Sequence, residues 1–331
     1  MKIKNLGFGF LGYHSTEQTI TLVKRAEELG FSSAWIAEDY FYAGAFSIAS
    51  MCAAHTSSIQ LGIGVINPYT RHPVLSAMEA AALDSLSGGR ALVAMGASNR
   101  RWMETELGIP YQKPITAVKE AVQIMKTVIH DGEITFNGEL FKTGPLQLDF
   151  TPLRRNQPIY TGVKGDRALF VTGQVADGIL LSAGCTLEYV SYARKKVAEG
   201  ARSVGRNPAE ITIAAYLPTC IREDSDEAVE AMRATTRHYL ALHGAQPILT
   251  CAGFAPEEVQ PFRDAFFSGE ECPNDVTDEM VRKIVIAGTP DECQSRMQAY
   301  VDAGVEMPIC FELGGEDPME TLQTVSSCFL H

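Results

Sequence analysis

Short apolar segments alternate along the chain with longer segments in which apolar residues recur every three to four positions. The clearest example is 59–98, where an apolar, β-branched segment (59–66) precedes a helical pattern and a second apolar segment (91–95). The helical spacing is set by Leu75, Met78, Ala82 and Leu86. Strands that are apolar throughout are typical of a parallel sheet covered on both faces. The segment therefore predicts a strand, a helix and a parallel strand.

The same alternation continues over the whole chain. Strands are predicted at 5–11, 33–37, 59–66, 91–95, 158–161, 177–182, 211–217 and 307–312. Helices are predicted at 15–29, 45–55, 74–86, 114–130, 166–175, 187–204, 224–243, 276–287 and 290–303, with a last helix after Gly314-Gly315. This order indicates an α/β fold, a (β/α)8 TIM barrel, in a single domain over 1–331. The alternative is an open doubly wound sheet, but no GxGxxG motif follows the first strand.

Two segments interrupt the alternation. In about 131–155, Asn137-Gly138 separates two short β-prone segments and predicts a hairpin with a type I′ turn. Such a hairpin cannot belong to an all-parallel sheet, so we expect an insertion. The segment 244–275 contains Pro, Gly and the pair Glu270-Glu271, and is predicted to be irregular, either as a lid or as structural padding.

Composition excludes several classes of protein. A net charge of −12 argues against nucleic acid or an anionic membrane surface as the main partner. No apolar segment approaches ~18 residues and no leader opens the chain, so we expect a cytoplasmic protein that acts on a small-molecule substrate. The eight cysteines include no CxxC pair, and the seven histidines show no metal-ligand spacing. We therefore expect buried, reduced thiols and no metal site.

Polar residues gather where the predicted strands end, and in a parallel barrel these ends meet at the mouth. Glu38-Asp39 follow the second strand, and these carboxylates either serve catalysis, cap the start of the next helix or belong to a solvated turn. Gly64-Val65 lies inside the third strand. Glycine there marks a bulge, the close approach of a flat ligand, or packing against a neighbouring strand. His14 follows the first strand, where it can face the mouth.

The segment Gly162-Val163-Lys164-Gly165-Asp166 joins the fifth strand to its helix. Its backbone N–H groups are placed to bind an anion at the helix N-terminus, and Lys164 adds a positive charge. A plain tight turn has the same composition, so both interpretations stay open.

Several segments together resemble the bacterial-luciferase-like superfamily. They are AWIAEDYF (34–41), LGIGVINPYTRHP (61–73), LDSLSGGR (83–90), PIYTG (158–162) and ADGILL (176–181). The resemblance covers about 5–220 in order, with a looser fit beyond. The most similar subgroup is the methylenetetrahydromethanopterin reductases that use the deazaflavin coenzyme F420.

This resemblance implies a (β/α)8 barrel, often dimeric, with coenzyme F420 or alternatively FMN in the mouth. It also implies a non-prolyl cis peptide at a bulge behind the cofactor ring, which by position is Gly64-Val65. Two departures separate this chain from the subgroup. Gly9 stands where the reductases carry an acid in the first strand, and Asp39 stands where related enzymes carry histidine after an acid.

We therefore expect an oxidoreductase that transfers a hydride between C5 of F420 and a small organic or pterin-like substrate. The alternatives are an FMN-dependent monooxygenase and a barrel that binds cofactor without turnover. The predicted catalytic residues are Glu38, as the preferred proton-handling acid, and Asp39. The predicted cofactor-binding residues are Gly64, Val65, Asn67, Gly96, Ser98, Asn99, Gly162, Val163, Lys164, Gly165 and Asp166. His14 and Trp102 are predicted to contact substrate, and a homodimer or higher homo-oligomer is expected.

Overall fold

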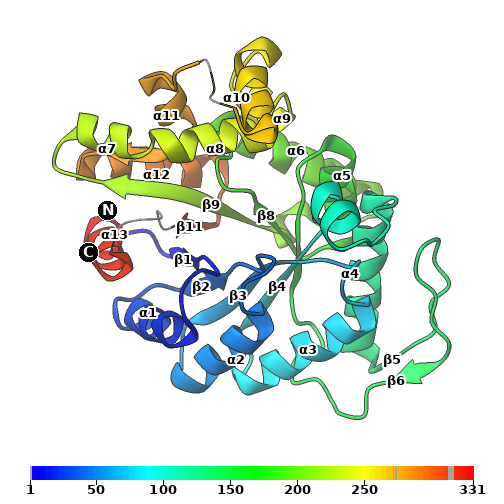
Figure 1. The fold of residues 1–331 in the computed structure, drawn as a ribbon. Helices are drawn as coiled ribbons and strands as arrows, with labels where there is room; N and C mark the ends of the chain where they lie inside the picture. Colours follow the sequence, from blue (N-terminus) through cyan, green and yellow to red (C-terminus); the bar gives the residue numbers. More distant parts are fainter. Residues whose placement is uncertain (1, 271, 273, 312–316) are drawn as a thin grey trace.

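Eight parallel strands form a closed barrel in the computed structural model, which describes residues 2–270, 272, 274–311 and 317–331 (Figure 1). In barrel order these strands are β1 (Gly7–Phe10), β2 (Ser33–Ile36), β3 (Gln60–Ile66), β4 (Ala91–Gly96), β7 (Ile159–Gly162), β8 (Gly178–Leu181), β9 (Thr212–Ile221) and β11 (Met307–Phe311). β8 pairs with β9, and β11 pairs with both β9 and β1, so the sheet has no open edge at these strands. The predicted TIM barrel is confirmed, and the open sheet is excluded.

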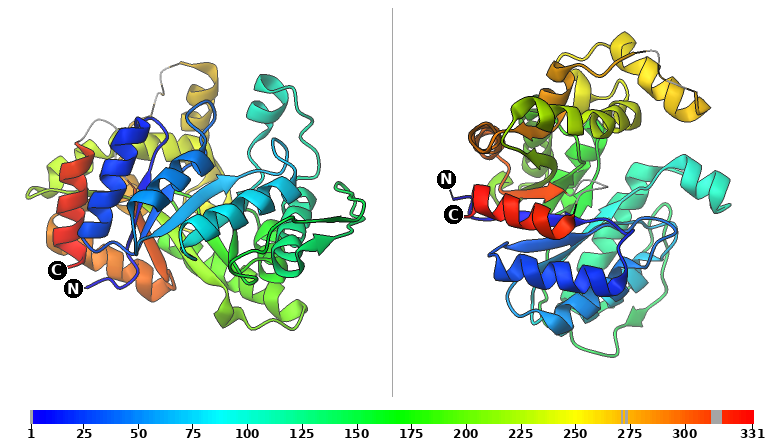
Figure 2. Two further views of the ribbon diagram at one scale, coloured as in Figure 1. Left: turned by 90° about the horizontal axis from the view of Figure 1, so that it is seen from below. Right: turned by 60° about the vertical axis from the view of Figure 1, so that its left-hand side comes forward.

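Helices surround the barrel, with α1, α2 and α3 on one side and α7, α8 and α12 on the other (Figure 1). The main helices are α1 (Thr16–Glu28), α2 (Ala45–His55), α3 (Pro73–Leu86), α4 (Pro114–Asp131), α5 (Asp166–Val175), α6 (Leu187–Ser203), α7 (Ser225–Ala231), α8 (Arg233–His243), α12 (Pro290–Ala303) and α13 (Pro318–Phe329). Shorter helical elements are a π-helix at η1 (Arg101–Glu106) and a 3-10 turn at η2 (Pro208–Glu210). The two termini lie side by side (Figure 2), where Ile3 N–H donates to the Phe329 carbonyl at 2.9 Å.

Large aromatic side chains fill the barrel interior. Trp35 on β2 is fully buried and lies near Tyr160 on β7 and Tyr216 on β9, with ring centroids 6.1 and 6.3 Å away. Glycine at 62 on the neighbouring strand is required for this packing, because a Cβ there would lie 2.3 Å from the Trp35 ring. Burial of such rings is the largest single apolar contribution that a core residue makes.

The insertion at 131–155 does contain a hairpin, but the type I′ turn predicted at Asn137-Gly138 is wrong. Neither residue has a positive φ, as that turn requires at both central positions. The carboxylate of Glu120 on α4 is buried and accepts the N–H groups of residues 139–141, which moves the tip of the hairpin to Glu139-Leu140. The short strands β5 (Glu133–Ile134) and β6 (Leu146–Gln147) pair below the tip.

The segment 244–275 is not irregular as predicted, because it contains α9 (Pro247–Thr250) and α10 (Pro256–Ser268). Pro247 and Pro256 occupy first-turn positions of these helices, where a missing N–H costs nothing, whereas Pro261 lies inside α10. The helix predicted at 224–243 is divided into α7 and α8 at Met232. The helix predicted at 276–287 ends as α11 (Asp278–Ile284), and β10 (Ile286–Gly288) follows and extends the sheet beside the end of β9.

The outer face of α3 is unusually apolar. The helix predicted at 74–86 is confirmed, but Leu75, Met78 and Leu86, which set its spacing, are 49%, 39% and 64% exposed. Most of the residues that α3 buries are small, including Ala77, Ala80 and Ala81, although Leu83 and Asp84 are buried as well.

No helix of the described residues is both long and apolar enough to cross a membrane. Within the same residues, no cluster of three His, Cys, Asp or Glu side chains is arranged to hold a metal ion. The predicted position of Glu312 at the end of the last strand and the Gly314-Gly315 turn lie outside the described residues.

Candidate active site at the barrel mouth

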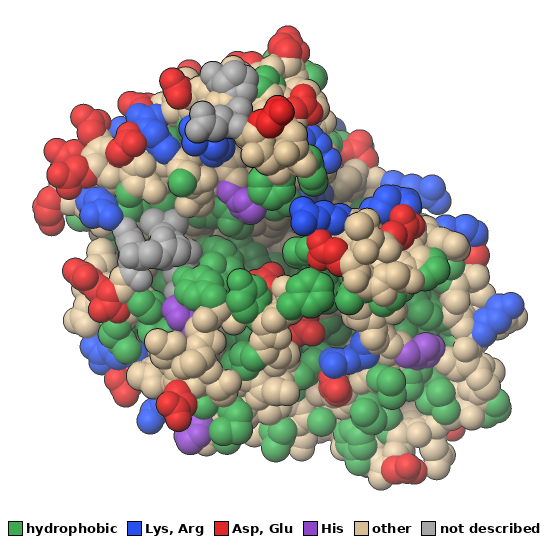
Figure 3. Space-filling view, in the orientation of Figure 1, with side chains coloured by type: hydrophobic (Ala, Val, Ile, Leu, Met, Phe, Trp, Pro, Cys, Tyr) green, Lys and Arg blue, Asp and Glu red, His purple; other side chains and the backbone are tan. Residues whose placement is uncertain are grey.

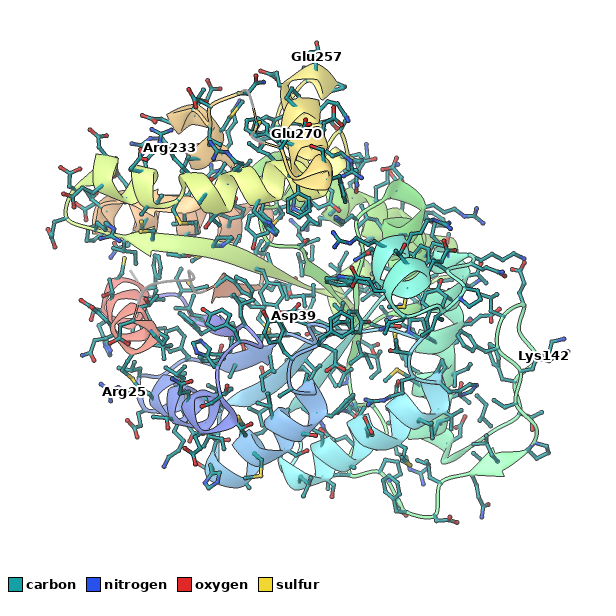
Figure 4. The ribbon with its side chains drawn as sticks, viewed as in Figure 1. Arg25, Asp39, Lys142, Arg233, Glu257 and Glu270 are labelled. Carbon is teal, nitrogen blue, oxygen red and sulfur yellow. The ribbon has the colours of Figure 1, made fainter. Side chains whose placement is uncertain are left out.

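The loops that follow the strands line a hollow between the α8–α10 side of the molecule and the α1–α3 side. Figure 3 shows hydrophobic side chains along this hollow and Lys and Arg side chains at its edge. Asp39, in the loop after β2, lies near the middle of the same view (Figure 4). A cavity of about 300 Å³ is lined here by residues of the loops after β2 and β3, including Glu38, Asp39 and Asn67. The predicted carboxylates are therefore at the mouth.

Glu38 is engaged in holding a helix. Its Oε2 accepts the N–H of Ala45 at 2.7 Å, at the first turn of α2. The N-cap residue of α2 is Gly44, which has no side chain to satisfy these N–H groups. Glu38 therefore caps the start of α2, which is one of the roles that the sequence left open for it.

Asp39 faces the interior of the mouth. Burial, and secondarily the charge of Glu38, raises the pKa of Asp39, although a hydrogen bond from the Gly12 backbone opposes the increase. Burial raises the pKa values of Tyr216 on β9 and Tyr239 on α8, and the charge of Asp39 adds to both increases. The charge of Asp39 therefore acts on both of these buried tyrosine side chains. Neither tyrosine was predicted, because both lie inside apolar or helical patterns that carry no site signal.

Gly9 leaves no room for an acid in the first strand. A Cβ at this position would lie 2.6 Å from the ring of Phe311 on β11 and 3.1 Å from Tyr216. The two rings contact each other with centroids 5.0 Å apart. Aromatic side chains thus occupy the space beside β1, and Asp39 is a carboxylate that reaches the mouth from β2 instead.

The bulge and the non-prolyl cis peptide expected at Gly64-Val65 are both present. The glycine itself serves packing, because a Cβ at Gly64 would lie 2.4 Å from Leu180 on β8. The side chain of Val65 lies over the ends of β4 and β7, where a Cβ at Gly96 or Gly162 would lie 2.6 or 2.4 Å from its methyl groups. Val65 and these two glycines therefore form one continuous part of the mouth wall.

The side chain of Asn67 organises the loop after β3. It is 3% exposed; its Oδ1 accepts the N–H groups of Tyr69 and Thr70, and its Nδ2 donates to the hydroxyls of Thr70 and Tyr40. All four hydrogen-bonding positions of the amide are used within the protein. Asn67 therefore positions Tyr40, whose ring packs edge-on against Trp102 with centroids 5.0 Å apart.

The loop after β4 leads into the π-helix η1. Ser98 has a φ of 61°, and its Oγ is buried beside the Tyr40 hydroxyl. The Oδ1 of Asn99 accepts the N–H of Trp102 at 3.0 Å and so begins η1. One-turn π segments are frequent at functional sites, and this one places Trp102 at the mouth. His14, after β1, lies partly exposed beside the ring of Tyr13 at 4.4 Å.

The loop after β7 presents open backbone N–H groups. Gly165 is the N-cap of α5 and offers no side-chain cap, and the N–H groups of residues 166–168 have no acceptor among the described residues. A Cβ on Gly165 would meet nothing within 4 Å, so this N-terminus is unobstructed. The Tyr189 hydroxyl fixes the loop by donating to the Lys164 carbonyl at 2.8 Å. The side chain of Lys164 extends to α8, where its Nζ lies 3.2 Å from Nδ1 of His243.

Comparison with known proteins gives a consistent result. The family model described as luciferase-like monooxygenase matches residues 7–307. A 5,10-methylenetetrahydromethanopterin reductase of Methanolobus tindarius is 31% identical over 285 residues, covering 85% of this chain and 86% of that protein. The reductase of Methanopyrus kandleri is 29% identical over 321 residues, covering 92% and 91%.

Solved structures agree with the sequences. The coenzyme F420-dependent tetrahydromethanopterin reductase from Methanopyrus kandleri has a TM-score of 0.87 at 27% identity, with 99% of each chain covered. An F420-dependent secondary alcohol dehydrogenase in complex with an F420-acetone adduct has a TM-score of 0.80 at 20% identity, covering 99% and 98%, which shows a shared fold. The chain belongs to the luciferase-like monooxygenase family.

Proposed function

We propose that this protein is a coenzyme F420-dependent oxidoreductase that transfers a hydride between C5 of the deazaflavin and a pterin-like substrate. The observation that carries this proposal is similarity over nearly the whole chain to 5,10-methylenetetrahydromethanopterin reductases, in sequence and in structure. The luciferase-like monooxygenases with similar structures are 14–21% identical and support only the fold.

The residues at the mouth fit such a cofactor. The open N–H groups at the start of α5 suit its phosphate, because a helix N-terminus carries partial positive charge. The wall formed by Val65, Gly96 and Gly162 is uncharged and smooth, as a flat ring requires. Asn67, Ser98 and Asn99 shape the adjoining loops and fix Tyr40 and Trp102. When bound, the cofactor supplies the carbon that accepts or donates the hydride.

Asp39 is the acid that manages the proton in this proposal, in place of Glu38. Burial raises the pKa of Asp39, which favours its protonated form, and Glu38 is already engaged by the first turn of α2. His14 and Trp102 border the mouth from the loops after β1 and β4, where they would contact substrate. The protein's contribution is to orient both reactants, to exclude water and to hold this proton.

Direct isotope transfer tests the proposal. Reduced F420 that carries deuterium at C5 is mixed with 5,10-methylenetetrahydromethanopterin in the presence of the protein. We expect oxidation of the cofactor and one deuterium atom in the methyl group of the product. A parallel reaction contains reduced FMN and oxygen. No turnover of F420, together with oxidation of reduced FMN by oxygen faster than in a protein-free control, would contradict the proposal.

A further inference from the structure

Lys164 is linked by hydrogen bonds to residues from the next two β/α units of the barrel. Lys164 follows β7, Ala183 follows β8, and His243 ends α8. His243 is fully buried; its Nε2 lies 2.8 Å from the Ala183 carbonyl, and its Nδ1 lies 3.2 Å from Nζ of Lys164. A carbonyl can only accept, so Nε2 carries the hydrogen, and Nδ1 accepts from the lysine. The imidazole is therefore neutral, and its tautomer is fixed by its two partners.

A lysine amine away from solvent is usually paired with a carboxylate, but Lys164 has no such partner among the described residues. Burial, and secondarily the charge of Arg263, lowers the pKa of Lys164 to about 8. Among the described residues, neither Lys164 nor Arg263 forms an ion pair with a carboxylate. The neighbouring titratable groups are Tyr239, whose ring stacks on His243, and His238, which adds only a repulsive contribution. The positive charge of Arg263 thus acts on Lys164, and neither side chain has a carboxylate partner among the residues that the structure describes.

The side chains of Arg263 and Lys164 bind different kinds of partner. The Arg263 Nη1 donates to the Ala241 carbonyl at 3.4 Å, near the C-terminus of α8, where a cation is favourable. Lys164 makes no such contact, because its amine is bound by an imidazole instead of a carbonyl. Its backbone is fixed independently by Tyr189. The Lys164 side chain is therefore fixed at its backbone by Tyr189 and at its amine by His243. The amine keeps further N–H hydrogens that bind no acceptor among the described residues.

We propose that Lys164, positioned by His243 and accompanied by Arg263, binds a carboxylate or phosphate group of a ligand at a subsite separate from the N-terminus of α5. His243 is a positioning residue in this arrangement, because it contacts the lysine and not the ligand. The anionic group belongs either to the tail of the cofactor, which carries a phosphate and carboxylates beyond the deazaflavin ring, or to the substrate. The choice of cofactor as probe rests on the proposed function, but the subsite itself does not.

The test compares full-length F420 with a truncated cofactor that has the same ring and ribityl chain but no phosphate or carboxylates. Their dissociation constants are measured by ring fluorescence for the wild type and for Lys164→Met, with Lys164→Gln as a second variant should the first not fold. If the cofactor tail is the ligand, Lys164→Met weakens F420 binding roughly 10- to 100-fold and leaves the truncated cofactor unchanged. If the substrate supplies the anion, both cofactors bind unchanged and the KM for substrate increases by a similar factor.

Variants of His243 distinguish positioning from a general structural effect. His243→Gln can still accept from Lys164 and donate to Ala183, so we expect F420 binding within about threefold of the wild type. His243→Phe removes both contacts and should resemble Lys164→Met, with no additional loss in the double variant. If the cofactor tail is the ligand, the ratio of the two dissociation constants should also change above about pH 8 in the wild type, as Lys164 loses its proton, and stay constant in Lys164→Arg.

The subsite is excluded if folded Lys164→Met changes neither the ratio of dissociation constants nor KM by more than about twofold. Should the wild type bind neither cofactor, the proposed function fails, and inorganic pyrophosphate becomes the probe. A thermal shift with pyrophosphate that is lost in Lys164→Met then supports the subsite. An equal shift in both proteins, or none in either, contradicts it.

Discussion

Among single residues, the adjacent acids Glu38 and Asp39 have different surroundings. Glu38 accepts the N–H of Ala45 in the first turn of α2, whereas burial raises the pKa of Asp39 and its charge acts on Tyr216 and Tyr239. The sequence places both acids at the end of a strand, but the conformation of the loop decides which one turns inward. That loop contains Phe41 at a φ of 83°, which no pattern of apolar and polar residues indicates.

Exchange of each acid for its amide tests this difference. Asp39→Asn should lower kcat by about 10²–10⁴-fold with the dissociation constant of F420 largely kept, because the amide cannot carry the proton. Glu38→Gln is the matched control, since its amide oxygen can still accept the N–H of Ala45. Steady-state kinetics of both variants decide the matter. If Glu38→Gln had a strongly reduced kcat and Asp39→Asn a kcat like that of the wild type, Glu38 would be the catalytic acid.

The open N-terminus of α5 gives a second prediction about a single residue. Gly165 has a φ of −88° and free space around its missing Cβ, so we expect Gly165→Leu to fold. The leucine side chain would obstruct the N–H groups of residues 166–168, and we expect F420 binding to weaken by roughly tenfold or more. Circular dichroism and thermal melting should match the wild type. Unchanged affinity in this variant would assign the loop a purely structural role.

Helices and strands that have a clear pattern of apolar residues could be predicted from the sequence. Elements that form through contacts with distant parts of the chain could not. The eight barrel strands follow from short apolar segments. By contrast, β10 forms because β9 extends past the barrel and offers an edge, and the hairpin tip is set by Glu120 on another element. His243 on α8 is far from Lys164 in sequence, so the contact between these side chains depends on the closed barrel.

Glu27 joins α1 to the start of β3 and gives a prediction at this scale. Its Oε1 accepts the N–H groups of residues 57–59 at 2.6–2.9 Å. Although burial acts to raise the pKa of Glu27, these hydrogen bonds outweigh it and lower the pKa to about 2. Because this folded-state pKa lies below the unfolded value of 4.5, the contribution to stability is present above pH 4.5 and lost as the pH falls toward 2.

We therefore expect Glu27→Gln to unfold at lower urea concentration than the wild type at pH 7, with the difference shrinking below pH 4.5. The neighbouring variant Glu28→Gln is the control, since Glu28 forms a surface pair with Arg25. A constant difference between wild type and Glu27→Gln from pH 7 to pH 3 would show that the carboxylate charge is not what stabilises this junction.

For the whole molecule, the exposed apolar face of α3 supports the expected homodimer, which we retain as a proposal. Leu75, Met78 and Leu86 are exposed there, and Met51 on the adjacent helix α2 is 45% exposed. Such a contiguous apolar face on two neighbouring helices suits a second copy of the same surface. The cytoplasmic location and single-domain organisation expected from the sequence also stay predictions.

Substitution on this face should separate the copies. Light scattering with size-exclusion chromatography is expected to show a dimer for the wild type and a monomer for Met78→Glu, because a charge would be buried in the interface. Val204→Glu, at the end of α6 and 51% exposed in the present structure, should leave the dimer intact. A wild type that is monomeric at micromolar concentration would contradict the proposed interface.

The choice of cofactor is the central claim, and equilibrium binding tests it most directly. F420 and FMN are titrated separately into the same preparation of the wild type, and both dissociation constants are determined from ring fluorescence. The proposed function predicts that F420 binds at least about tenfold more tightly than FMN. Binding of FMN as tight as or tighter than that of F420 would contradict it.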